Sequence, residues 1–177
     1  MFFILLASFW TNFLKRLAPS LISKGNFLSI NWVIPGKLAV GPLPQPGDSA
    51  QLAAADIQVV LSLCAEQEGA LPEDVRSNFQ CLHWFIPDSH YDIELKVGDL
   101  ARAVELVHQT RSNQLPIYVH CLAGMQRSPT VCIAYLMRYH KLELWEAVNW
   151  LKQVDPASSP TEYQLRVVRE FISQEAD

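Results

Sequence analysis

The stretch VHCLAGMQRSPT, residues 119–130, decides the fold, because it contains a strand end, a loop and a helix start in direct succession. The apolar run LPIYVH, residues 115–120, has the length and composition of a buried strand. Residues 128–140 then follow with apolar positions at helical spacing. Ligands of sheets covered by helices bind at such strand ends, so the sequence predicts a functional site at residues 120–127.

Strands and helices alternate on both sides of this stretch. Continuous apolar runs of strand length are typical of strands buried on both faces, and segments of helical periodicity separate them. Residues 31–48 are rich in Pro and Gly and are expected to hold a single short strand, 38–41. The other expected strands are 57–64, 81–87 and 115–120, and the expected helices are 49–57, 95–109, 128–140, 144–154 and 160–173. This order predicts an α/β fold with a mostly parallel central sheet and helices on both faces.

The composition of the 177 residues, half apolar and 18% charged, is that of one globular domain. A net charge of −4 gives no electrostatic footprint for nucleic acid. Four scattered cysteines without a C-x-x-C pair disfavour zinc and thioredoxin-type chemistry, and they indicate a reducing, cytoplasmic location. Cys64, Cys81 and Cys132 are expected to be small buried apolar residues.

The N-terminal residues 1–28 are expected to form an apolar helix and a linker ahead of a catalytic domain at 29–177. The apolar run lacks the basic start and cleavage site of a secretory signal, and it is shorter than the roughly 20 residues that span a bilayer. Residues 1–18 have apolar positions at helical spacing, and Pro19 predicts the end of that helix. A helix lying on a membrane surface, a terminal helix docked on the domain, and a translation start placed too early all remain open.

The loop after residue 120 has the chemistry of an anion site. A loop that runs from a strand directly into a helix can turn its backbone N–H groups inward, with the positive end of the helix dipole behind them. Such a setting favours the thiolate form of a cysteine, so Cys121 is the candidate nucleophile. Arg127 can hold a tetrahedral oxyanion through two parallel hydrogen bonds. The candidate phosphate-binding residues are Leu122, Ala123, Gly124, Met125, Gln126 and Arg127.

Two neighbours of the loop have alternative roles. His120 is expected to support the loop from behind, which overlaps with the role of a buried structural histidine. Ser128 stands before Pro129 and can cap the helix, or it can donate a hydrogen bond to the Cys121 sulfur. The positive charge of the loop and of Arg127 makes a metal or another cofactor unnecessary.

Transfer of phosphate to sulfur needs a proton for the leaving oxygen. The segment FIPDSHYDIEL, residues 85–95, offers carboxylates on another loop. Asp88 directly follows the expected strand and is the preferred general acid, whereas Asp92 lies nearer the next helix and is the alternative. Either carboxylate could instead be a solvated loop residue or a helix cap.

The segment VHCLAGMQRSPT resembles the signature of cysteine-dependent phosphatases, a Cys and an Arg separated by five residues, in the form used by dual-specificity phosphatases. The resemblance extends over about residues 31–172, because GKLAVGPLP, IQVVLSLC and FIPDS fall where such domains carry their earlier strands and acid loop. It implies that Cys121 is the nucleophile, Arg127 the phosphate ligand, Ser128 the helper of the thiolate and Asp88 the general acid. It also implies a phosphorylated protein, or a small phosphate monoester, as the substrate.

Departures from the family pattern bear on the substrate. Gln126 replaces the Ser that often precedes the Arg, and the loop lacks the basic residues usual in phosphoinositide phosphatases. No separate loop for phosphotyrosine recognition is evident, so phosphotyrosine and phosphoserine or phosphothreonine are both expected substrates. A small-molecule or lipid phosphatase is the alternative. A silent phosphate-binding module is disfavoured because the chain keeps Cys121 and Arg127, and the Ala-Gly-x-x-Arg-Ser-Pro-Thr pattern disfavours a rhodanese.

Overall fold

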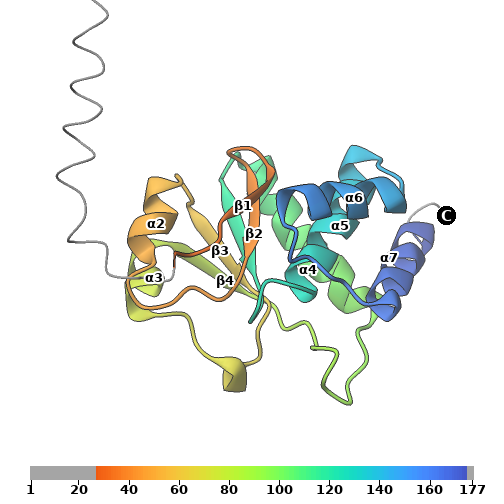
Figure 1. Ribbon diagram of the computed structural model, residues 1–177, viewed down its shortest axis with the longest axis horizontal. Helices are drawn as coiled ribbons and strands as arrows, with labels where there is room; N and C mark the ends of the chain where they lie inside the picture. Colours follow the sequence, from red (N-terminus) through yellow and green to blue (C-terminus); the bar gives the residue numbers. More distant parts are fainter. Residues whose placement is uncertain (1–26, 175–177) are drawn as a thin grey trace, which may run out of the picture.

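The computed structural model describes residues 27–174, which form one mixed sheet between two layers of helices (Figure 1). The order of its five strands is β1-β2-β5-β3-β4. The strands are β1 (Asn31–Ile34), β2 (Leu38–Gly41), β3 (Val59–Ser62), β4 (Gln80–His83) and β5 (Ile117–His120). β2, β5, β3 and β4 run parallel, and only β1 is antiparallel to its neighbour within this sheet. The predicted mostly parallel α/β sheet is therefore confirmed.

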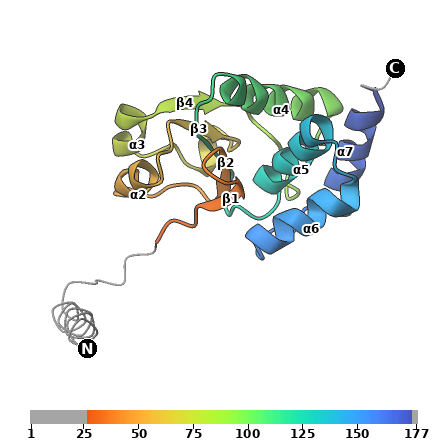
Figure 2. The same cartoon turned by 90° about the horizontal axis from the view of Figure 1, so that it is seen from above.

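Helices cover both faces of the sheet, as Figure 2 shows from above. One face packs against α2 (Ser49–Ala54) and α3 (Glu73–Asn78). The other packs against α4 (Val97–Ser112), α5 (Arg127–His140), α6 (Leu144–Val154) and α7 (Glu162–Gln174).

The central strand β5 shows why both layers form. Tyr118 faces the core under α2 and α3, whereas Ile117 and Val119 face the larger core under α5. Side chains alternate between the two faces of a strand, so a strand covered on both faces reads as a continuous apolar run.

The Pro- and Gly-rich segment holds two strands, so the expectation of a single strand there is wrong. β1 and β2 form a hairpin in which Asn31 lies opposite Val40. Its turn is closed by a hydrogen bond of 2.9 Å from Lys37 N to Ile34 O. Gly36, at φ +64°, provides the left-handed conformation that this turn requires after a proline.

One strand boundary and the burial of one cysteine differ from the prediction. The expected strand 81–87 ends at His83, and residues 84–96 continue as the loop that carries Asp88. Cys64 and Cys132 are buried as predicted, but Cys81 is exposed because β4 is an edge strand. None of the helices in residues 27–174 is long and apolar enough to cross a membrane. The predicted N-terminal helix lies outside the described residues.

Candidate active site

The loop of residues 121–126 joins β5 to α5 and is anchored from outside by its own carbonyl groups. Leu122 O accepts a hydrogen bond of 3.1 Å from Leu43 N, and Met125 O accepts one of 2.7 Å from Ser159 N. A planar trans peptide points its N–H away from its C=O, so the N–H groups of the residues that follow these carbonyls point into the loop. Two N–H groups therefore have the orientation that the predicted anion nest requires at the N-terminus of α5.

Gly124 lets the loop lie directly against the end of β2. Its φ of +74° is in the left-handed region, and a Cβ atom there would lie 2.6 Å from Gly41 C. A side chain at this position would therefore meet backbone, which cannot rotate away.

Cys121 lies at the bottom of the loop with 2% of its surface exposed, and its thiol is free. The buried Ser128 hydroxyl donates to Cys121 Sγ at 3.3 Å and lies 3.5 Å from Gly41 O. Ser128 does not cap α5, because the helix begins one residue earlier and Gln126 occupies the cap position. Of the two roles considered for Ser128, the geometry excludes capping and leaves the bond to sulfur.

Arg127 is buried, with 1% of its side chain exposed, and two carboxylates from other loops surround its guanidinium. Its two terminal nitrogens bond Glu68 in a bidentate pair at 2.7 and 2.8 Å. Nη2 also lies 3.0 Å from Asp88 Oδ2. Although burial lowers the pKa of Arg127, the hydrogen bond with Glu68 and the surrounding negative charges raise it overall, so the group is a permanent cation.

Glu68 has no signal of its own in the sequence pattern, and it lies on the short 3-10 helix η1 (Glu66–Glu68) after β3. Burial raises the pKa of Glu68, but the hydrogen bonds from Arg127 and from the Ala65 backbone lower it overall. A buried arginine is stable only beside a counter-charge, and this requirement was the signal for a carboxylate on a neighbouring loop.

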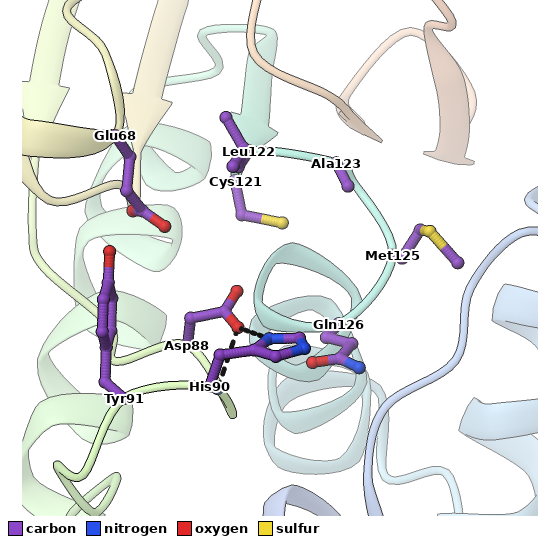
Figure 3. Close-up of a pocket in the computed structure, with 9 residues that line it drawn as sticks. All are labelled: Glu68, Asp88, His90, Tyr91, Cys121, Leu122, Ala123, Met125 and Gln126. Atoms are coloured by element: carbon purple, nitrogen blue, oxygen red, sulfur yellow. Dashed lines mark hydrogen bonds and ion pairs between the residues drawn. The ribbon is translucent and has the colours of Figure 1, made fainter.

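The structure distinguishes between the two candidate acids. Asp88 lines the cleft above Cys121, with its carboxylate turned toward the sulfur (Figure 3). Asp92 lines only a neighbouring hollow next to Tyr163, which Asp88 also borders. Burial raises the pKa of Asp88, but hydrogen bonds from the His90 ring and backbone and the charge of Arg127 lower it overall. In the free site Asp88 is therefore a carboxylate.

His120 is fully buried behind the loop, as predicted. Its Nδ1 lies 3.3 Å from Cys121 O, the geometry of a supporting hydrogen bond. Burial lowers the pKa of His120 to about 4, which keeps the ring neutral at physiological pH.

A cleft of about 510 Å³ opens above the sulfur (Figure 3). Its wall combines the acid loop, η1 and the phosphate loop; its lining residues are Glu68, Asp88, His90, Tyr91, Cys121, Leu122, Ala123, Met125 and Gln126. Leu122 and Met125 stand at the rim with 46% and 42% of their surfaces exposed. The cleft thus has a polar bottom and a partly apolar rim.

Comparison with known proteins gives a consistent match. Residues 43–174 match the family model of the dual specificity phosphatase catalytic domain. Dual specificity protein phosphatase 14 of Mus musculus is 31% identical over 159 residues, which are 89% of this chain and 76% of that protein. Dual specificity protein phosphatase Mpk3 of Drosophila melanogaster is 31% identical over 143 residues, and phosphatidylglycerophosphate phosphatase PTPMT2 of Arabidopsis thaliana is 28% identical over 134.

The chain spans only part of those last two relatives. It covers 34% of the Drosophila protein and 59% of the Arabidopsis protein. Among solved structures, Tk-PTP in the active form has a TM-score of 0.72 at 24% identity, over 82% of this chain and 97% of that one. PTPMT1 in complex with PI(5)P has a TM-score of 0.69 at 22% identity, over 80% and 96%. These two likenesses establish the fold.

Proposed function

The chain belongs to the dual specificity phosphatase family, and on that premise we propose that it hydrolyses phosphate monoesters through a phosphocysteine intermediate. The observation that carries the proposal is the position of Cys121 Sγ. It lies at the bottom of the cleft, before the N-terminus of α5, and accepts a hydrogen bond of 3.3 Å from the Ser128 hydroxyl. A thiolate held in this way is a nucleophile directed at any phosphorus bound in the nest.

The reaction has two steps. In the first, Cys121 Sγ attacks phosphorus, the P–O bond to the leaving group breaks, and Asp88, which takes up a proton when the substrate binds, gives that proton to the leaving oxygen. Arg127 and the N–H groups of the loop hold the other phosphate oxygens. In the second, Asp88 takes a proton from water, the water oxygen attacks phosphorus, and the S–P bond breaks. The Ser128 hydroxyl then stabilises the departing thiolate.

We propose a phosphorylated protein as the substrate, at tyrosine, serine or threonine. Among residues 27–174, His90 is the basic side chain that lines the cleft, and Glu68 and Asp88 add negative charge to its wall. Phosphoinositides and phosphatidylglycerophosphate carry further anionic phosphate groups, and this cleft offers few cations to bind them. A phosphopeptide presents one phosphate and a side chain that can pack on Leu122 and Met125.

A lipid or other small phosphate monoester is the second candidate. Two features support it: the relatives in Arabidopsis thaliana that are named phosphatidylglycerophosphate phosphatases, and the exposed apolar rim, which could meet acyl chains. A silent phosphate-binding module is the weakest candidate, because Cys121 and a candidate acid line one cleft and Arg127 contacts that acid at 3.0 Å.

A turnover panel tests the proposal. The assay compares four kinds of substrate at the same concentration of phosphate ester, with EDTA present. They are phosphotyrosine peptides, phosphothreonine peptides, nucleotides, and vesicles of phosphatidylglycerophosphate or PI(5)P. We expect the peptides to be hydrolysed fastest, and Cys121→Ser to bind phosphate without turnover. EDTA should leave the rate unchanged, because Arg127 and the α5 N-terminus supply the positive charge. Faster release from lipid vesicles would favour the second candidate, and turnover by Cys121→Ser would refute the covalent mechanism.

The cellular setting belongs to the same proposal. The thiolate chemistry of Cys121 needs a reducing compartment, which supports a cytoplasmic location. A membrane-surface role for residues 1–18, ahead of the catalytic domain at 29–177, stays a prediction. Binding of the full chain to anionic vesicles, compared with a chain beginning at residue 27, tests it.

A further inference from the structure

The carboxylate of Asp88 is bound on both of its oxygens in the free site. Oδ2 lies 3.0 Å from the buried Arg127 Nη2. Oδ1 accepts a hydrogen bond of 2.6 Å from the His90 ring Nδ1 and one of 3.1 Å from the His90 backbone N (Figure 3). Asp88 is 21% exposed and the His90 side chain is 87% exposed, so the carboxylate stands between an inner cation and a ring in solvent.

This arrangement raises a question about the source of the catalytic proton. A general acid must carry a proton when the leaving oxygen departs. Asp88 carries none in the free site, because the His90 hydrogen bonds and the Arg127 charge lower its pKa below the ordinary value despite burial. A phosphate dianion in the nest competes for Arg127 and adds negative charge beside Asp88. Both effects favour protonation of the carboxyl group, and a proton must then reach it.

We propose that His90 is the positioning residue that holds Asp88 and exchanges its proton with solvent. The proposal rests on the proposed phosphatase function. Histidine is the side chain that most readily gains and loses a proton near neutral pH. The His90 Nδ1–H lies on Asp88 Oδ1, and the exposed ring can take up its next proton from water.

The proton balance closes over one turnover. When phosphate binds, protonated His90 passes its Nδ1 proton to Asp88 and becomes neutral. Asp88 then protonates the leaving oxygen as the P–O bond breaks and the S–P bond forms. Between the two steps the exposed ring of His90 takes up a proton from solvent. In the second step Asp88 takes a proton from the attacking water, which leaves to solvent through His90, while the S–P bond breaks. The hydroxyl of that water stays on phosphorus, and Cys121 is released as the thiolate.

The other charged and titratable groups beside Asp88 and His90 favour proton delivery through His90 over delivery from a group inside the cleft. They come from the acid loop, η1, the phosphate loop and α5, and they are Tyr91, Glu68, Cys121 and Arg127. Arg127 holds Glu68 as a carboxylate, so Glu68 has no proton to give. Burial raises the pKa of Tyr91, so its hydroxyl releases its proton less readily. His90 is the group of this set that is both in contact with Asp88 and largely in solvent.

Three variants separate proton exchange from simple support. His90→Ala removes the ring, His90→Asn keeps an N–H donor near the Nδ1 position but cannot titrate, and His140→Ala is the control. His140 is exposed at the far end of α5, roughly 20 Å along the helix from Arg127 at 1.5 Å per residue. The measurements are kcat and KM for a phosphothreonine peptide and for an activated aryl phosphate.

For the peptide, we expect His90→Ala and His90→Asn each to lower kcat about tenfold, less than the full 10²–10⁴ of a general acid. KM for the peptide should stay within about twofold of the wild-type value. For the aryl phosphate, kcat should fall less than about twofold, because a good leaving group needs little proton transfer. Added imidazole should restore the rate of His90→Ala. In an Asp88→Asn background, His90→Ala should have no further effect. A wild-type rate in His90→Asn, or no recovery with imidazole, would overturn the proposal.

A second measurement does not depend on turnover. The Asp88 carboxyl carbon is titrated by NMR in the wild type and in His90→Ala. Loss of the His90 donors should move the titration midpoint of Asp88 to higher pH. An unchanged midpoint would refute the control of Asp88 by His90. If the wild-type chain hydrolyses no phosphate monoester, the proposed function fails, and the NMR result still decides whether His90 controls the protonation of Asp88.

Discussion

Replacing Glu68 by Gln tests how Arg127 is held. Glu68 and Arg127 are joined at 2.7 and 2.8 Å, and their side chains are only 7% and 1% exposed. Gln keeps the shape and one acceptor oxygen, but its NH₂ group then faces a guanidinium N–H. One charge-assisted hydrogen bond is therefore replaced by a clash of donors, and a buried cation loses its nearest counter-charge.

The expected cost follows from this geometry. Breaking a buried ion pair from one side costs about 3–5 kcal/mol, and the remaining contact of Arg127 with Asp88 places this variant at the lower end. A loss of about 3 kcal/mol lowers Tm by roughly 6–12 °C, at about 2–4 °C per kcal/mol for a chain of this size. The guanidinium also loses its fixed direction, so kcat/KM for an aryl phosphate should fall on the order of 10²-fold.

Glu66→Gln is the matched control, because Glu66 lies on the same short helix η1 and is exposed. It should change the stability by no more than about 0.5 kcal/mol. The stability that Glu68 contributes should also depend on pH. The pKa of Glu68 is depressed in the folded chain, so its contribution is present at neutral pH and is lost as the pH falls through that pKa. The Tm difference between wild type and Glu68→Gln should narrow in acid. Equal Tm and kcat/KM values for the two variants would refute the reasoning.

Three further substitutions test the rest of the site. Arg127→Lys should reduce kcat/KM nearly as much as Arg127→Ala, because the charge remains but the bidentate geometry is lost; a rate near wild type would make Arg127 a simple point charge. Asp88→Asn should slow a phosphothreonine peptide on the order of 10²–10⁴-fold and an aryl phosphate far less, and the opposite result with Asp92→Asn would exchange the two assignments. Gly124→Ala should cost about 1–3 kcal/mol in thermal unfolding and weaken phosphate binding, because its φ of +74° is strained for Ala and its Cβ would meet the Gly41 backbone.

The strand–loop–helix at residues 115–140 could be predicted because all of its signals are local. The apolar run of β5, the small residues of the loop and the helical spacing of α5 lie next to one another in the sequence. Parallel strands bring their carboxyl ends to one edge, so the sequence also placed Asp88 near Cys121.

Glu68 and His90 could not be found in this way. Glu68 meets Arg127 across 59 residues of sequence, from a 3-10 turn that has no periodicity. His90 meets Asp88 only because the segment after β4 folds as a loop and not as the longer strand expected at 81–87. The hairpin of β1 and β2 was missed because Pro and Gly residues that close a turn also resemble those of an irregular segment.

Gln126, the departure from the family pattern, acquires a physical role from the position of the acid loop. Ser89 Oγ donates to Gln126 Oε1 at 2.8 Å, beside the contact of 3.0 Å between Arg127 and Asp88. These two contacts join the acid loop to residues 126 and 127, one at the general acid itself and one at the residue after it. Catalytic groups that are already in place need no reorganisation when substrate binds. Gln126 and Arg127 are thus adjacent residues that both contact the acid loop in the free site.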